Sequence, residues 1–187
     1  MIGRLPKTLN VGGIDRNIRT DYRDALVIFS AYNDVELTND EKTQVMLECL
    51  YIDFEDIEPQ HYHEAVEKGV WFLDGGTMFV NKPVQSKKVM DWEQDEQIIF
   101  PAINKVAGFE TRAVEYMHLW TFLGFFCEIG EGLFSTVLSI RQKKNKGKKL
   151  EKHEEEFYRE NKHLIDIETK LSEQEQAEKD YLNKILS

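Results

Sequence analysis

Hydrophobic side chains recur every three to four residues along most of this 187-residue chain, the spacing that places them on one face of an α-helix. Near the N-terminus the period is two instead, in two short runs separated by Gly12-Gly13. Because glycine accepts the positive φ angles of a tight turn, these runs predict a β-hairpin over about residues 8–19. The pattern therefore predicts a mainly α, multi-helix domain with a short N-terminal β-hairpin.

Start and stop signals divide the helical part of the chain. Thr38 and Glu41 match a capping box, in which the hydroxyl accepts a backbone N–H and the glutamate reaches back. Pro101 lies inside a helical pattern and predicts a kink or a second helix start there, and residues 77–90 predict a loop. The expected helices run from Thr20 or Asp21 to Asn33, from Thr38 to about Phe54, from Pro59 to Gly75, from Asp91 to Gly108, from Glu110 to about Glu128, and from Leu133 towards a lysine-rich segment.

The segment from Glu110 to Glu128 is apolar on nearly every side. Such a helix is either a central buried helix or a docking surface for another protein. Charged residues interrupt the apolar run, which never approaches the roughly 18 residues of a membrane span, so we expect no membrane association. His118 is expected to be a core histidine or part of an interface. The side chains that would contact a protein partner are Trp120, Phe122, Phe125, Phe126 and Phe134.

The character of the sequence changes at Leu150. Phe157, Asn161 and Leu164 then fit one helix face, and the last stretch, 172–187, carries only a thin apolar stripe. We expect a helical core domain over residues 1–150 and a C-terminal helical extension over residues 151–187. The last helix would project from the domain or depend on a partner.

Acidic and basic residues are unevenly distributed along the chain, whose net charge is −10. Residues 21–67 hold thirteen acidic and two basic side chains, whereas residues 141–149 hold six basic and no acidic ones. This sorting leaves open whether the two segments attract each other within the fold or between copies of the chain. A net acidic chain repels phosphate, so we expect a helix C-terminus and a turn at Gly147 rather than a nucleic-acid site. The candidate basic patch consists of Arg141, Lys143, Lys144, Lys146, Lys148 and Lys149.

No arrangement of residues points to catalysis, to a cofactor or to a metal. His61 and His63 are two residues apart and would point to different faces of a helix. The carboxylates of residues 53–58 lack the ligand spacing of a calcium loop, and Asp91 and Asp95 fit the start of a helix. Phosphate-binding loops and nucleophile elbows are absent from the sequence. We therefore expect a protein that is not an enzyme.

The cysteine content and the N-terminus indicate a cytosolic protein. Cys49 and Cys127 are far apart and form no CxxC motif, so we expect both to be reduced. The N-terminal residues lack the apolar stretch of a signal peptide.

Packing motifs in the second half of the chain resemble those of a known family. They comprise His118-x-Trp120-x-Phe122, Phe134, Ile140-Arg141 and Gly147-Lys148-Lys149-Leu150. Further similar positions are Trp92, Asp95, Ile98, Ile99, Ala102, Ile103 and the run Ile18-x-Thr20-Asp21-Tyr22-Arg23 after the hairpin. On these residues the chain resembles the "gene product fifteen" family of tailed phages and prophages of Gram-positive bacteria, over almost the whole chain to about Ile167.

The resemblance implies a tail assembly chaperone of a long-tailed phage. Such a protein would bind the tape measure protein, with the tail tube protein as a further partner, and would keep the tape measure soluble while the tube assembles. It would act in the host cytoplasm and be absent from the mature virion. The alternatives are a structural tail or connector protein of the virion, or a weak nucleic-acid-binding phage protein. Self-association into a homo-oligomer stays open.

Overall fold

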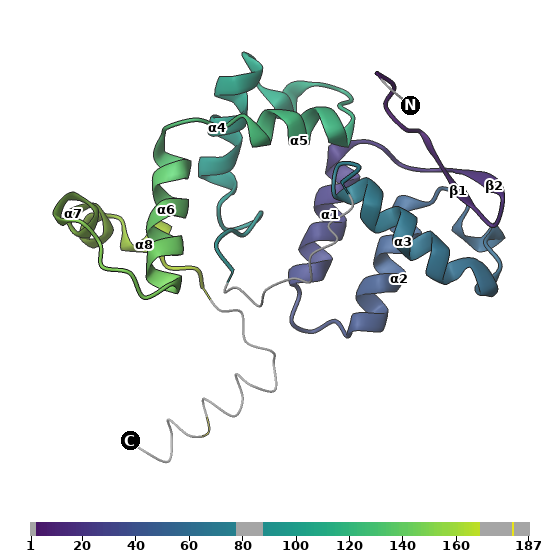
Figure 1. Cartoon of the computed structure of the whole chain (residues 1–187), viewed down its shortest axis with the longest axis horizontal. Helices are drawn as coiled ribbons and strands as arrows, with labels where there is room; N and C mark the ends of the chain where they lie inside the picture. The colour runs from purple at the N-terminus through teal and green to yellow at the C-terminus, as the bar shows by residue number, and fades with distance from the viewer. Residues whose placement is uncertain (1–2, 78–87, 169–180, 182–187) are drawn as a thin grey trace.

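The computed structural model describes residues 3–77, 88–168 and 181, and it confirms a mainly α chain that begins with a β-hairpin (Figure 1). Strands β1 (Thr8–Val11) and β2 (Ile14–Asn17) pair antiparallel. Between them Gly12 (φ 61°) and Gly13 (φ 78°) take the left-handed conformation that a two-residue hairpin turn requires. The Gly12 N–H donates to Glu64 Oε2 at 2.9 Å, which ties the turn to the third helix.

Helices α1 (Tyr22–Asn33), α2 (Asn39–Leu50) and α3 (Tyr62–Leu73) follow the hairpin and pack in sequence order, α1 on α2 and α2 on α3. Asp21 caps α1 by accepting a backbone N–H with its side chain. The capping box predicted at Thr38 is present at the start of α2. These starts follow the sequence signals because each cap uses only residues within one helical turn.

Helix α2 ends at Leu50, short of the predicted end near Phe54. Tyr51 is extended because its backbone pairs with Ile18 at the end of the hairpin, and the Arg19 N–H donates to the Leu50 carbonyl at 2.8 Å. The buried Tyr51 hydroxyl donates to the Ala65 carbonyl of α3, and burial raises the pKa of this phenol. The chain then reaches α3 through two short 3₁₀ turns, η1 (Phe54–Asp56) and η2 (Pro59–His61).

Helices α4 (Glu96–Ala107), α5 (Leu119–Cys127) and α6 (Leu133–Asn145) form the next part of the fold, with α4 packed against both others. Helix α4 runs without a break through Pro101, so the second helix start considered from the sequence does not occur. It ends at Gly108, whose φ of 80° is left-handed, as the glycine predicts.

The helix predicted from Glu110 to Glu128 is wrong in its first half. A 3₁₀ turn, η3 (Thr111–Ala113), is followed by extended backbone, and α5 starts only at Leu119. The extended residues pair with the segment before α1, since the Tyr22 N–H donates to the Met117 carbonyl at 3.0 Å. His118 then caps α5, because its Nδ1 accepts the Trp120 N–H at 3.1 Å. Long-range pairing thus replaces the helix that the local apolar pattern favours.

Two short helices follow α6, namely α7 (Lys152–Glu160) and α8 (Lys162–Ile165). The single helix face predicted from Phe157 onwards is interrupted at Asn161. Helix α8 packs back on α6, and Ile165 belongs to the same buried cluster as the rest of the core. The segment from 151 to 168 is therefore packed on the preceding domain, and the predicted last helix, 172–187, lies outside the described residues apart from residue 181.

Aromatic side chains form the centre of the core. Tyr22 of α1 stacks on Phe122 of α5 with ring centroids 4.2 Å apart and planes 10° apart. Phe100 of α4 and Trp92 lie against the same Phe122 ring. In Figure 1 the hairpin and α1–α3 lie at one end of the molecule and α6–α8 at the other, joined through α4 and α5. The contacts within this aromatic cluster join the two ends of the molecule.

None of the helices in residues 3–77 and 88–168 is long and apolar enough to cross a lipid bilayer.

Two helical glycines give opposite predictions for stability. A Cβ on Gly69 of α3 would lie 2.8 Å from Met46 Sδ and 3.0 Å from Leu50 Cδ2 of α2, whereas a Cβ on Gly124 of α5 would meet nothing within 4 Å. We expect Gly69→Ala to lower the free energy of unfolding by about 1–3 kcal/mol through overpacking. Gly124→Ala should raise it by up to about 1 kcal/mol, because alanine is the better helix former.

Urea unfolding followed by circular dichroism measures both changes. Equal effects of the two substitutions would contradict the close packing of α3 on α2.

Candidate functional site

The aromatic residues expected to contact a partner divide into buried and accessible ones. Phe122 and Phe134 lie in the core, 0% and 4% exposed, so the fold itself covers them. Trp120 is half-buried, donates from Nε1 to the Phe72 carbonyl at 2.8 Å and packs against α3. Phe125 and Phe126 are also half-buried. Of the five side chains, only Trp120, Phe125 and Phe126 keep part of their surface open to solvent.

The basic segment does not form a continuous surface patch, which corrects the grouping made from the sequence. Arg141 is buried. Lys143 pairs with Glu154 of α7 at 2.6 Å, and Lys144 pairs with Asp166 at 2.5 Å. Helix α6 ends at Asn145 and a turn with a left-handed glycine at 147 follows, as predicted. Only Lys146, Lys148 and Lys149 are exposed with no salt bridge to the described part of the chain.

Within the described part of the fold, the basic segment pairs with nearby carboxylates and not with the acidic segment. Within the described ranges, the ion pairs of residues 141–149 run to Asp95, Glu151, Glu154 and Asp166, and none runs to the acidic segment 21–67. That segment keeps exposed carboxylates, and the protein presents them to the outside.

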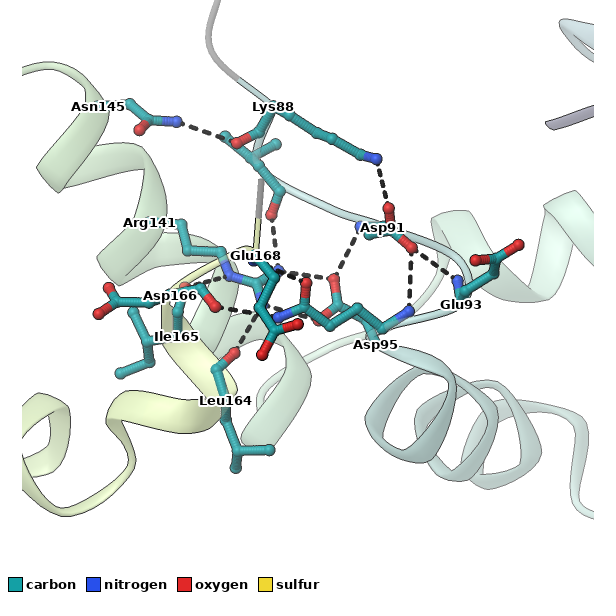
Figure 2. Close-up of polar contacts among 12 residues, drawn as sticks. Lys88, Asp91, Glu93, Asp95, Arg141, Asn145, Leu164, Ile165, Asp166 and Glu168 are labelled. Carbon is teal, nitrogen blue, oxygen red and sulfur yellow. Dashed lines mark hydrogen bonds and ion pairs between the residues drawn. The ribbon is translucent and has the colours of Figure 1, made fainter. Parts of the chain in front are cut away.

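A buried ion pair joins Arg141 of α6 to Asp95, the residue before α4. The two side chains are 3% and 1% exposed, and Nη1 and Nη2 donate to the two carboxylate oxygens at 2.6 and 2.7 Å. The guanidinium also donates to the backbone carbonyls of Val89, Leu164 and Ile165 (Figure 2). Every N–H group of the arginine therefore has an acceptor, which offsets the cost of removing two charges from water. Asp95 does not cap α4, contrary to the sequence interpretation.

Asp91 supports this ion pair from the segment before α4. Its N–H donates to Asp95 Oδ2 at 2.9 Å, and its own Oδ1 accepts the N–H groups of Glu93 and Gln94. Its Oδ2 pairs with the Lys88 ammonium (Figure 2). Burial by itself raises the pKa of Asp91, but the hydrogen bonds from Lys88 and from the backbone N–H groups outweigh it and hold this pKa below its usual value of 3.8.

Gln94 holds the backbone that follows α8. Its Nε2 donates to the Asp166 carbonyl and its Oε1 accepts the Glu168 N–H, each at 3.0 Å. The side-chain amide thus forms the two hydrogen bonds that the backbone of a neighbouring β-strand would form, because it offers one donor and one acceptor. Arg141 and Gln94 together fix residues 164–168 against the start of α4.

A separate, apolar groove lies between α4 and the start of α6. It has a volume of about 570 Å³. One wall is α4 from Gln97 to Val106, and the other is formed by residues 128–135. Leu133, the first residue of α6, is 46% exposed at this groove. An apolar side chain left so open at a concave surface marks a candidate binding site.

The histidines serve structural purposes in this fold. His118 is buried, with Nε2 2.9 Å from the Pro6 carbonyl and Nδ1 accepting the Trp120 N–H. Because a carbonyl can only accept, Nε2 carries the proton, and His118 is the core histidine considered from the sequence. His61, the last residue of η2, lies beside Glu64, and His63 lies beside Glu67 on the surface of α3. Within the described residues no group of three or more His, Cys, Asp or Glu side chains could hold a metal ion.

A family model described as "Bacteriophage Gp15 protein" matches residues 1–167. The chain belongs to the bacteriophage Gp15 family. No curated protein and no solved structure matches this Gp15 family member. The family match ends at residue 167, between the two backbone groups, Asp166 O and Glu168 N, that the Gln94 side chain holds. The Gp15 match therefore includes nearly all of the segment that Arg141 and Gln94 fix.

Sequence reasoning missed two features of this Gp15 protein. Gln94 looked like one of several polar residues at a helix start, and its partners are more than seventy residues away. The groove also went unnoticed, because its walls come from α4 and from residues 128–135. A sequence signal existed for Arg141 alone, because it lies seven residues after Phe134 and four after Val137, which places it on the same face of α6 as these two buried side chains.

Breaking the buried ion pair should strongly destabilise the Gp15 fold. We expect Arg141→Met to lower the free energy of unfolding by about 3–5 kcal/mol, because it leaves the Asp95 carboxylate buried without a partner. The double variant Asp95→Leu/Arg141→Met, which removes both charges, should recover part of the loss. Urea unfolding provides the measurement. The exposed Lys146→Met serves as control and should stay within about 0.5 kcal/mol of the wild type; a matching small effect of Arg141→Met would contradict the assignment.

The Asp91 carboxylate should make stability depend on pH. Asp91→Asn keeps an oxygen for the helix start but loses the charge opposite Lys88, so it should be less stable than the wild type near neutral pH. Because the folded-state pKa is below 3.8, this difference is fully present above that value and is lost as the pH falls through the lower folded-state pKa. Urea unfolding of both proteins between about pH 7 and pH 2 measures the difference. A difference that stays constant over this range would contradict the ionised state.

Proposed function

We propose that this protein is a tail assembly chaperone, which binds the tape measure protein of its phage and keeps it soluble while the tail tube assembles. The observation that carries the proposal is the match of residues 1–167 to the bacteriophage Gp15 family. The protein acts by holding another protein rather than by catalysis, works in the host cytoplasm, and is absent from the mature virion.

The surface of the chain supports a holding role. A long helical client exposes apolar stripes that aggregate unless another surface covers them. The groove beside α4 offers apolar side chains, and the half-buried Trp120, Phe125 and Phe126 add apolar area on α5. The net charge of −10 keeps a complex of chaperone and client dissolved through repulsion between complexes.

The distribution of basic residues favours a protein client over nucleic acid. Arg141 is buried and Lys143 and Lys144 are neutralised by carboxylates. Within residues 141–149, three exposed lysines remain without a salt bridge to the described part of a strongly acidic chain, and this supports at most weak, salt-sensitive contact with phosphate.

Co-expression with the tape measure protein of the same phage tests the proposal. We expect most of the tape measure protein to be soluble and to co-purify with this chain, and to be insoluble without it, because its apolar stripes then stay uncovered. Solubility is measured as the fraction in the supernatant after lysis. An equally soluble, unbound tape measure protein in the absence of this chain would refute the chaperone role.

Mass spectrometry of purified virions separates the chaperone from a structural tail protein. The chaperone should be absent from mature particles, whereas a tail or connector protein would be present in a fixed ratio to the tube protein.

A further inference from the structure

The groove beside α4 has the shape that receives a helix. Two neighbouring rows of α4 side chains, each spaced by four residues, line it: Gln97, Pro101 and Lys105, and Ile98, Ala102 and Val106. Rows of this spacing are the ridges that interlock when two α-helices pack. The lining runs over ten residues of α4, from Gln97 to Val106, and the nine rises between them, at about 1.5 Å each, give a length of about 14 Å, or two to three helical turns.

The opposite wall presents apolar side chains next to unpaired charge. Ile129, Leu133 and Phe134 contribute the apolar part, and Leu133 is the most exposed of the three. Glu128 and Glu131 are exposed at the same wall, and neither forms an ion pair within the described residues. The Lys105 ammonium is turned to the Glu131 backbone carbonyl, at 3.4 Å, rather than to a carboxylate.

The first wall contains a proline within the helix. Pro101 has no N–H, so the Gln97 carbonyl lacks its usual helical donor four residues on, and both residues line the groove. A groove with apolar side chains and an acidic edge recognises a partner that is apolar along one stripe and carries positive charge beside it.

We propose that this groove, formed by α4 and residues 128–135, binds one amphipathic helix of the client, with the apolar stripe of that helix between the α4 ridges and Leu133 and with a lysine or arginine beside Glu128 and Glu131. This assignment rests on the proposed chaperone function and locates its binding site. A second copy of the chain fits the groove less well, because it would bring another acidic surface, of net charge −10, to an acidic edge.

Leu133→Glu tests the groove without disturbing the fold. Leu133 is 46% exposed at the first position of α6, where a glutamate interacts favourably with the helix dipole. The matched control is Val27→Glu, which adds the same charge at a helical position of α1 that is 56% exposed and outside the groove. Both variants are co-expressed with the tape measure protein, and the co-purified amount is compared with that of the wild type.

We expect Leu133→Glu to reduce the co-purified tape measure protein about tenfold or more, the effect of losing one well-packed contact, and Val27→Glu to leave it unchanged. If the wild type binds and Leu133→Glu binds equally well, the groove assignment is wrong while the chaperone function stands. Equal losses in both variants would show an effect of charge alone and would also overturn the assignment. Failure of the wild type to bind would remove the chaperone function itself.

Cys127 allows a second, direct measurement. This exposed thiol directly precedes Glu128 of the groove wall, and Cys49 is the other cysteine of the chain. In a Cys49→Ser background, a photo-crosslinker on Cys127 should capture the tape measure protein. The same reagent in a Cys49→Ser/Cys127→Ser/Val27→Cys variant should not. Capture from position 27 alone would overturn the assignment.

Discussion

The buried contact between Arg141 and Asp95 constrains the second half of this protein more than any other interaction. Two charges removed from water are tolerated only when every donor and acceptor is satisfied. That requirement brings together three stretches of chain: the segment before α4, helix α6, and the backbone of Leu164 and Ile165. In helices α7 and α8, Ile165 is fully buried, and Phe157, Tyr158 and Leu164 pack partly buried against the core. The polar contacts of Arg141 and Gln94 add to this apolar packing and fix the backbone of residues 164–168.

The first half of the chain is joined to the second half by backbone pairing and aromatic stacking. Backbone pairing between residues 20–22 and 117–119, together with the stack of Tyr22 on Phe122, connects α1 to α5. Asp21 contributes twice, because it caps α1 and accepts the Met117 N–H at 3.0 Å. Much of the most apolar segment of the sequence, residues 110–128, is used in these contacts with α1 and the residues before it. The proposed client site is therefore the groove beside α4 rather than the apolar segment as a whole.

The division of charge fits a protein that holds an aggregation-prone client. Lysines near the end of α6 stabilise the fold locally through Glu154 and Asp166, so they do not cancel the carboxylates of the first half. The complex would keep those carboxylates on its outside, where repulsion opposes aggregation.

The sequence by itself determined the features that depend on neighbouring residues. The hairpin turn at Gly12-Gly13, the capping box at Thr38 and the stop at Gly108 all follow from local conformational preferences, and the structure has each of them. The packing motifs also sufficed to indicate the Gp15 family. Tertiary structure alone decided where α5 begins, because the residues before Leu119 pair with a segment almost a hundred positions away. It also decided that Arg141 is buried while neighbouring lysines are not, and that α4 and residues 128–135 enclose a groove. Such features require contacts between distant parts of the chain, and the energy of those contacts exceeds the weak local preferences that a sequence pattern reports.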